Sequence, residues 1–329
     1  MSPSEIQHTF FNLIKVHLPA HLSLVDEIAG LLDLSNDSAY RRIRGEKELS
    51  LHEIQLLALH YKISLDQLMG MQSNAILFHG DLLDRNTFSF ETYLQSMLQN
   101  LKNIAAMPNR HFYFEAKDIP PFHHFQFPMM AAFKYFFWMR IIMQDFNLSK
   151  KIFDPQEFKG QLDQDGIGIG KLYTSIPSSE LWNLDTLNGT MRQIEFCVET
   201  GMFDNKIVRR SIYEDLMQMI EHIEMQATVG KKFMLGEIPD EKSGPFNLYI
   251  NEVNLGHNTM LVTNDIQPVV FINHNVLNFM VTYDQRFCQY SGGMMQNIIS
   301  KSSLISGVNH KDRTKFFNVL KGKVAEKMH

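Results

Sequence analysis

Residues 23–70 read SLVDEIAGLLDLSNDSAYRRIRGEKELSLHEIQLLALHYKISLDQLMG, and their pattern of polar and apolar residues predicts a small all-helical domain. Ser23, Ser35, Ser50 and Ser64 each precede a segment with apolar residues at helical spacing. Serine is favoured at the start of a helix, because its hydroxyl accepts a hydrogen bond from a free N–H group of the first turn. We therefore expect four short consecutive helices, with a very short break between the first and the second.

The second of these helices, residues 36–44, has a thin apolar side formed by Ala39 and Ile43 and is ended by Gly45. Asp37, Ser38, Arg41 and Arg44 fall on the opposite side, and Tyr40 and Arg42 lie on the flanks. One interpretation is an ordinary solvated surface. The other, which the tight preceding turn and the arginines favour, is a helix that contacts DNA bases and phosphates. The contact residues expected are Ser35, Asn36, Asp37, Ser38, Tyr40, Arg41, Arg42, Arg44 and Lys47.

The stretch IAGLLDLSNDSAYRRIRGEKELSLHEIQLLA resembles the XRE family, the lambda Cro and repressor type of helix-turn-helix protein, over roughly residues 5–70. The resemblance implies a five-helix domain, with Leu18 or Pro19 ending the first helix and residues 35–44 docking in the major groove. Aspartate stands in the turn where the family often has glycine. The positions that carry the resemblance are Ala29, Leu32, Asp33, Leu34, Ser35, Arg44, Gly45 and Lys47.

The charge of the chain limits how it could bind DNA. The formal net charge is −5, and residues 1–70 hold six basic and nine acidic residues, a net charge of −3. A protein that binds nucleic acid by bulk electrostatics should be basic. DNA binding would therefore rely on the local cluster Arg41, Arg42, Arg44 and Lys47. The alternative is a protein-protein interaction module whose helical head binds a protein partner.

The sequence contains no feature that indicates secretion or a membrane. Cys197 and Cys288 are the only cysteines, which supports no disulfide framework and is typical of a reducing cytoplasm. No signal peptide is recognised at the N-terminus. The most apolar window, residues 125–143, is interrupted by Lys134 and Arg140, whereas about 20 apolar residues are needed to cross a bilayer. We expect a cytoplasmic protein with a buried helix at this window.

The composition changes after residue 70, and the pattern predicts a domain 1–70, a hinge 71–87 and a larger α+β region 88–329 for sensing or dimerisation. Residues 246–283 alternate in hydropathy about turns at 256–258 and 274–275, which indicates two hairpins. A strand is expected at 111–115. Helices are expected at 90–105, 129–146, 186–200, 205–228, 285–301 and 311–328.

Motifs for catalysis are weak in this region. GIGIGK at 166–171 lacks the spacing of a phosphate-binding P-loop and is interpreted as a flexible turn. His111, His123 and His124 could collect a metal, but their spacing matches no helix face, and ordinary structural histidines are favoured. No catalytic arrangement can be argued from spacing. We therefore expect neither an enzyme nor a bound cofactor or metal; an enzyme carrying a helix-turn-helix is the third alternative.

Aromatic residues are concentrated between residues 112 and 138. An ordinary hydrophobic core is the favoured interpretation. An apolar pocket for a small ligand and a homodimer surface are the alternatives, because both are rich in aromatic residues and methionine. The residues are Phe112, Tyr113, Phe114, Phe122, Phe125, Phe127, Phe133, Tyr135, Phe136, Phe137 and Trp138.

The sequence as a whole predicts a one-component transcription regulator of the bacterial type. Its DNA-binding head would be joined to a sensor or dimerisation region, and two copies of the chain would bind double-stranded DNA.

Overall fold

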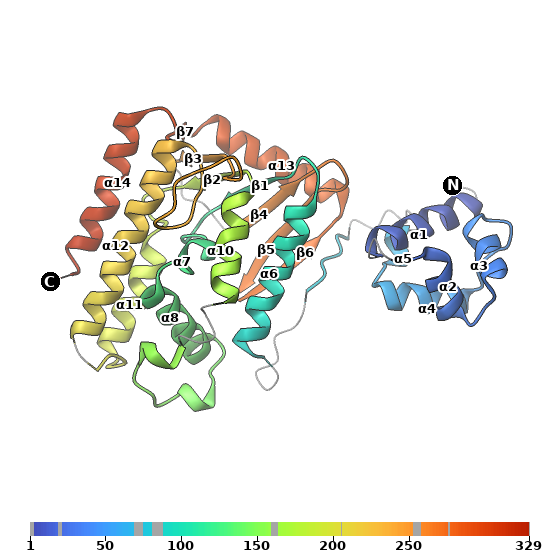
Figure 1. The fold of residues 1–329 in the computed structure, drawn as a ribbon, viewed down its shortest axis with the longest axis horizontal. Helices are drawn as coiled ribbons and strands as arrows, with labels where there is room; N and C mark the ends of the chain where they lie inside the picture. Colours follow the sequence, from blue (N-terminus) through green and yellow to red (C-terminus); the bar gives the residue numbers. More distant parts are fainter. Residues whose placement is uncertain are drawn as a thin grey trace. The chain divides into compact units, whose positions relative to one another are not determined.

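The chain divides into two compact units, Met1–Leu77 and Phe78–His329 (Figure 1). The division falls within the expected hinge 71–87, of which residues 71–74 and 81–87 lie outside the described part. The first unit is helical and the second combines helices with a mixed sheet, so the expected α+β class of the larger region is confirmed. The computed structural model describes residues 3–18, 22–68, 75–80, 88–158, 164–204, 206–252, 258–275 and 277–328.

The N-terminal unit packs short helices around one small core. The helices α2 to α5 begin directly after the serines named above. Ser35 and Ser50 each accept a hydrogen bond from a backbone N–H of the following first turn, whereas Ser23 makes no such side-chain bond. The first helix ends one residue before Leu18, and Pro19 lies outside the described residues. The core consists of Phe10, Phe11, Ile14, Ile28, Ala29, Ala39, Leu57, Ala58 and Leu68. The helices are α1 (Pro3–His17), α2 (Leu24–Leu32), α3 (Asn36–Ile43), α4 (Leu51–Tyr61) and α5 (Leu65–Leu68).

The C-terminal unit is built on a seven-stranded sheet with the order β6-β5-β4-β1-β2-β3-β7. Strands β1, β2 and β3 are parallel, and the remaining neighbours are antiparallel. The strands are β1 (His111–Glu115), β2 (Ser178–Trp182), β3 (Phe246–Ile250), β4 (Thr259–Thr263), β5 (Val269–Asn275), β6 (Asn278–Thr282) and β7 (Ser303–Leu304). The strand predicted at 111–115 is confirmed.

One of the two predicted hairpins is wrong. Strands β5 and β6 pair antiparallel, as expected for the second hairpin, although residues 274–275 belong to β5 and the chain reverses after them. Strands β3 and β4 do not pair with each other: β3 lies between β2 and β7, and β4 lies between β1 and β5. The alternation of side chains shows which segments are strands, but the partner of each strand depends on distant segments that the local pattern does not contain.

Helices cover both faces of the sheet (Figure 1). The helices predicted near 90–105, 186–200, 205–228, 285–301 and 311–328 are confirmed. The expected helix 129–146 is shorter, because α8 passes into a π-helical segment, η1, before the short 3₁₀ turns η2 and η3. The helices are α6 (Phe90–Ala106), α7 (Pro121–His124), α8 (Pro128–Phe137), η1 (Trp138–Ile142), η2 (Phe146–Leu148), η3 (Pro155–Phe158), α10 (Asp165–Ser175), α11 (Asn188–Glu199), α12 (Lys206–Val229), α13 (Gln285–Ser300) and α14 (His310–Ala325).

The glycine-rich stretch 166–171 forms the first part of α10, so its interpretation as a flexible turn is wrong. Its glycines permit close packing. A Cβ atom on Gly168 would lie 3.2 Å from the Leu98 side chain, and one on Gly170 would lie 3.3 Å from Met234. Packing against neighbouring elements therefore outweighs the weak helix propensity of glycine.

The alternation of the strands divides their side chains between two cores. Tyr113, Leu261 and Val270 lie opposite one another on β1, β4 and β5 and face the core that includes Cys288 and Met295 of α13. The large core occupies the other face. It contains most of the aromatic residues between 112 and 138, which confirms the interpretation of this cluster as core.

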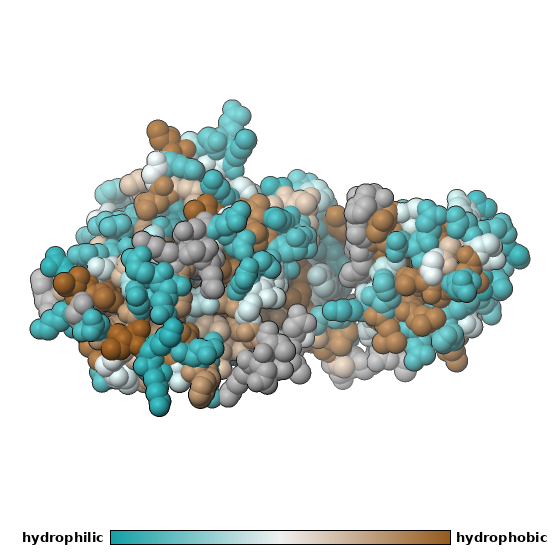
Figure 2. Space-filling model, turned by 60° about the horizontal axis from the view of Figure 1, so that its bottom comes forward, coloured by the Kyte–Doolittle hydropathy of each residue, from teal (hydrophilic) through white to brown (hydrophobic). Residues whose placement is uncertain are grey.

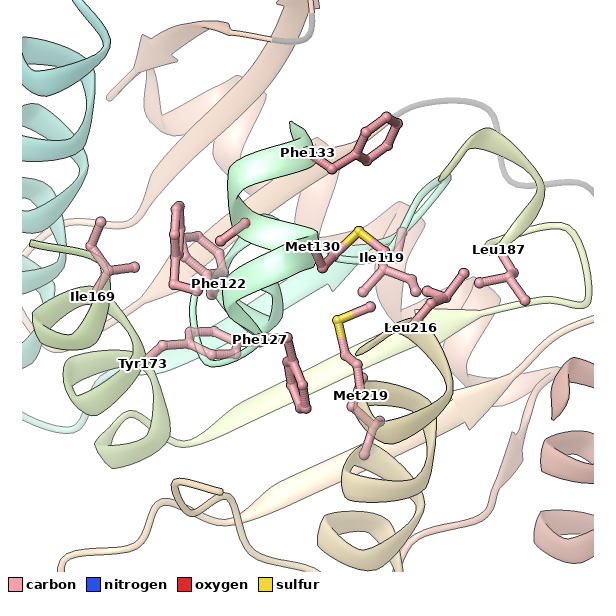
Figure 3. Packing of buried hydrophobic residues seen from close by; sticks show 14 of the residues in the cluster. Ile119, Phe122, Phe127, Met130, Phe133, Ile169, Tyr173, Leu187, Leu216 and Met219 are labelled. Carbon is pink, nitrogen blue, oxygen red and sulfur yellow. The ribbon is translucent and has the colours of Figure 1, made fainter. Parts of the chain in front are cut away.

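Figure 3 shows the centre of the large core, where Phe122 of α7 lies against Tyr173 of α10. Their ring centroids are 4.5 Å apart in a stacked arrangement. Met130 of α8 and Met219 of α12 lie close to each other in the same core, where α8 packs against α12. Cys197 is buried in the same core, as expected. In the described part of the chain, no helix has the length and apolar character required to cross a membrane.

Strand β2 carries a charged residue into this core. Glu180 is fully buried and accepts hydrogen bonds from Trp182 Nε1 at 2.8 Å, from the Tyr173 hydroxyl and from His123 Nε2, whose distance to Oε1 is 3.0 Å. Lys232 is also buried and lies 3.6 Å from the centroid of the Tyr173 ring. This carboxylate therefore joins α7, α10 and β2 through its own hydrogen bonds.

Gly244 supplies a test of the packing between β3 and α10. Its N–H donates to the Thr174 carbonyl at 2.8 Å, and a Cβ atom would lie 2.8 Å from the carbonyl carbon and oxygen of Ile176. Because these are backbone atoms, Gly244→Ala should destabilise the unit by roughly 1–3 kcal/mol. The measurement is urea unfolding followed by tryptophan fluorescence, since both tryptophans, Trp138 and Trp182, lie in this unit.

Gly293→Ala is the matched control, because a Cβ atom on this exposed helical glycine of α13 meets nothing within 4 Å. This variant should be neutral or up to about 1 kcal/mol more stable. Equal stabilities of the two variants would contradict the close approach at Gly244.

Candidate nucleic-acid interface

The turn between α2 and α3 is stabilised by local hydrogen bonds. Asp33 adopts a left-handed conformation with φ 52° and ψ 54°, and the N–H of Leu34 donates to the Ala29 carbonyl at 2.9 Å. Aspartate tolerates this conformation better than most residues. Ser35 is extended, and its hydroxyl accepts from the Ser38 N–H at 3.3 Å to begin α3. The chain therefore changes direction within three residues, at positions 33–35.

Arg42 is buried, so its prediction as a DNA contact is wrong. Only 4% of the residue is exposed. Its guanidinium donates to Glu53 Oε1 at 2.7 Å and to the Ser38 carbonyl at 3.2 Å. Glu53 closes the first turn of α4 through a capping box with Ser50, so the same carboxylate that caps α4 also holds α3. Arg42 is therefore a structural link between the two helices.

The other predicted contact residues lie at the surface of α3 and the loop that follows it. Tyr40 is 46% exposed, and the guanidinium of Arg44 lies over its ring at 4.6 Å from the centroid. Ser38 is half-buried. A shallow depression of about 230 Å³ is lined by Asn36, Asp37, Tyr40, Arg41, Arg44 and Glu46. The exposed residues are Ser35, Asn36, Asp37, Tyr40, Arg41, Arg44 and Lys47. We call Tyr40, Arg41 and Arg44 the α3 triad.

Glu46 was not among the predicted residues, although it lies beside both arginines of the triad. Gly45 has φ 73°, and after it the N–H of Glu46 donates back to the Arg41 carbonyl at 2.9 Å. The carboxylate then lies 3.9 Å from Arg41 Nε and 3.8 Å from Arg44 Nη1. Exposed pairs of this length are weak, worth about 0–1 kcal/mol. They nevertheless reduce the positive charge of the surface.

Gln7 of α1 holds the loop after α3 in place. Its side-chain Nε2 donates to the Arg42 carbonyl at 2.7 Å and to the Lys47 carbonyl at 2.8 Å, and its Oε1 accepts from the Leu49 N–H at 3.1 Å. The residue is 9% exposed. Gln7 therefore satisfies backbone groups that would otherwise be buried without partners. No local sequence pattern links it to residues 35 to 42 positions away.

The histidines considered as metal ligands have separate surroundings. His111 Nε2 lies 2.9 Å from Ser179 Oγ, and His123 pairs with Glu180. Among the described residues, the ring nitrogens of His124 have no hydrogen-bond partner. No group of three or more histidine, cysteine or acidic residues in the described part of the chain is arranged to hold a metal ion.

The Arg42–Glu53 pair generates a prediction about stability. Burial alone would raise the pKa of the Glu53 carboxyl, but the hydrogen bonds from Arg42 and Ser50 and the charge of Arg42 lower it below its ordinary value. Arg42→Ala leaves the half-buried Glu53 carboxylate with its Ser50 N–H bond but without its charged partner and should cost about 2 kcal/mol. Hydrogen-deuterium exchange of peptides from α2 to α4 should then become markedly faster at pH 7.

The stabilising effect of this pair has a defined pH dependence. Because the pKa of Glu53 is lower in the folded state, the stabilisation is complete above the ordinary glutamate pKa and is lost as the pH falls through the lowered value. The difference in protection between wild type and Arg42→Ala should therefore shrink in acid. Arg44→Ala, at an exposed site, is the control. Unchanged exchange in Arg42→Ala would contradict the structural role.

The surface of α3 is thus the candidate binding surface of the smaller unit. It presents two arginines and a tyrosine on a short helix whose position is held by buried polar contacts from α1 and α4. Comparison with known protein families, curated proteins and solved structures finds no significant match for this chain.

Proposed function

We propose that the protein is a sequence-specific DNA-binding transcription regulator in which α2 and α3 act as a helix-turn-helix. The observation that carries this proposal is the division of roles among the arginines of α3. Arg42 faces inward and fastens the helix to Glu53, whereas Arg41 and Arg44 are exposed together with Tyr40. A solvated helix needs no such fastening, but a helix that reads bases must be held in one orientation.

The dimensions of α3 suit this role. Eight residues give a helix of about 12 Å, and the major groove is about 12 Å wide. Arginine can donate two hydrogen bonds to the edge of a guanine, and the polar residues Ser35, Asn36 and Ser38 at the N-terminus of the helix suit a neighbouring phosphate. The interface would therefore combine base contacts from the triad with few phosphate contacts.

The larger unit would then supply sensing or dimerisation. Two copies of α3 in a homodimer would reach half-sites about 34 Å apart. A ligand or partner that binds one arrangement of the two heads better than another would shift the population and change DNA affinity.

A specific observation favours protein binding as the second candidate. Leu51 and Leu59 of α4 are 83% and 71% exposed, and residues 1–70 have a net charge of −3. Figure 2 shows a brown hydrophobic area among hydrophilic side chains on the smaller unit. Exposed leucines on an acidic domain are suited to a protein partner or a second copy.

The triad supplies the first test of the DNA-binding proposal. A binding site is selected from random duplex DNA with the full-length protein, and affinities are measured by fluorescence anisotropy. Arg41→Ala and Arg44→Ala should each weaken binding about tenfold or more, because each removes a base contact worth about 1–3 kcal/mol. Arg210→Ala, at an exposed position on α12 of the larger unit, is the control and should bind like wild type.

Two outcomes would contradict the proposal. One is that no sequence is enriched at 50 mM salt, which would favour the protein-binding candidate. The other is that the triad variants and the control bind equally well. Circular dichroism of each variant separates a lost contact from a lost fold.

Glu46 supplies a second test with the opposite sign. Glu46→Gln removes a negative charge beside Arg41 and Arg44 and should strengthen DNA binding about two- to fivefold at low salt. The gain should disappear at high salt, because exposed charges are screened. Glu199→Gln, at an exposed position at the end of α11, is the control for the loss of a single charge. Weaker binding of Glu46→Gln would argue against contact of this surface with DNA.

A further inference from the structure

A cavity of about 410 Å³ with polar and apolar residues in its lining lies in the larger unit, where the parallel strands β1 and β2 end. Its wall is formed by the segments that follow these strands, 117–121 and 183–189, and by parts of α7, α8, η1 and α11. Residues of β1, β5 and β6 and Asn258 complete the lining. In sheets with parallel strands, loops at the carboxyl ends of the strands commonly form ligand sites. The position of this cavity is therefore one in which a binding site is expected.

Two buried side chains in the cavity wall lack hydrogen-bond partners. His124 is 2% exposed and Trp138 is 4% exposed. Among the described residues, neither ring nitrogen of His124 nor Nε1 of Trp138 has a partner. A buried polar group left unpaired costs about 1–3 kcal/mol. Both residues line the cavity, so a molecule bound there could satisfy them.

Lys134 gives the cavity a rigid polar wall. Its residue is 2% exposed, and its Nζ donates to Thr190 Oγ1 at 2.6 Å, to Gln193 Oε1 at 2.9 Å and to Asp118 Oδ2 at 3.3 Å. These contacts join α8 to α11 and to the segment after β1. The three protons of the ammonium group are used within the wall, and its charge is balanced by Asp118.

The remaining charge of the lining is positive. With Lys134 and Asp118 balanced, the other ionised side chains are the exposed Lys117, Asp185 and Arg192. Asp185 accepts a hydrogen bond from Asn188 at 2.7 Å, which satisfies part of its charge. Burial and the nearby charges of Lys134 and His123 hold the pKa of His124 well below its usual range, so this imidazole is neutral. The cavity thus offers two cations against one carboxylate.

Part of the lining is apolar. Phe114, Ile119, Pro121, Trp138 and Phe279 contribute carbon surface, and the volume is that of a pocket for a small molecule. A ligand that fits both parts has a flat apolar portion and a negatively charged end. Of the aromatic residues between 112 and 138, Phe114 and Trp138 line this cavity, so the alternative of a ligand pocket takes the form of a mixed cavity.

We propose that this cavity binds a small organic anion with an aromatic ring, an aryl carboxylate or aryl phosphate. The ring lies against Phe114 and Trp138, and the anionic oxygens accept hydrogen bonds from His124, from Trp138 Nε1 and from Arg192. This inference goes beyond DNA binding and does not depend on it.

The test uses four probes of similar size with the full-length protein: benzoate, phenyl phosphate, the neutral benzamide and the cationic benzylamine. Binding is followed by tryptophan fluorescence, since Trp138 lines the cavity, and by isothermal titration calorimetry. Benzoate or phenyl phosphate should give a saturable change. Their affinity should exceed that of benzamide about tenfold or more, because a charged group forms the stronger hydrogen bonds. Benzylamine should not bind.

Arg192→Met should weaken binding of the anions about tenfold and leave the weak binding of benzamide unchanged. Arg192 is exposed, so this variant should keep the fold, and His124→Leu, at a buried position, should also weaken binding of the anions. Arg210→Met, on α12 outside the cavity lining, is the matched control and should bind the anions normally. The proposal is overturned if neither anion gives a saturable signal at 10 mM, if benzamide binds equally well, or if Arg192→Met binds like wild type.

Discussion

The larger unit depends on one constraint: a carboxylate in the middle of its sheet has no access to water. Glu180 lies on β2, between β1 and β3, and is fully buried. An isolated buried charge is costly, so the fold must supply hydrogen bonds and opposite charge around it. The partners come from three elements: Trp182 of β2 itself, Tyr173 of α10 and His123 of α7. Their positions are therefore tied to one another through this single group.

The same constraint affects Lys232, which is buried beside Tyr173. Burial lowers the pKa of Lys232 to about 7, although the negative charge of Glu180 acts in the opposite direction. Its Nζ has no hydrogen-bond partner among the described residues and contacts the face of the Tyr173 ring. Between pH 7 and the ordinary lysine pKa, the unfolded chain holds a proton that the folded chain has released, so this residue makes stability rise with pH in that window. The negative charge of Glu180 thus reduces the free-energy cost of burying a protonated Lys232.

The hydrogen bonds of Glu180 also affect one wall of the cavity. Helix α7 is a single turn, and its last two residues point to different surroundings: His123 to Glu180 and His124 to the cavity. Because Glu180 holds His123, the neighbouring imidazole has little freedom. Lys134 holds the other side of the cavity by joining α8 to α11. Two buried charged residues, Glu180 and Lys134, therefore hold different parts of the cavity wall through their hydrogen bonds.

The sequence allowed correct prediction of those features that depend on residues close together in the chain. Ser35 and Ser50 marked helix starts correctly, because a cap involves only the next few residues. Strand β2 was missed, since SSELW contains two serines and a glutamate and resembles an exposed segment, although each of its residues is buried. The polar groups of β2 are acceptable in the core only because of partners such as His123, which lies more than 50 positions away. Such partners have no local signature.

The same distinction applies to the exposure of the arginines at α3. Periodicity placed Arg41 and Arg44 at the surface of α3, and both are exposed. It could not show that Arg42 turns inward, because this depends on Glu53 of α4. Lys134 carried a usable signal: a lysine within an apolar helix must find acceptors when the helix is buried. The sequence pattern predicted only a buried helix there. The partners Asp118, Thr190 and Gln193 lie on other segments and have no signal near Lys134 in the sequence.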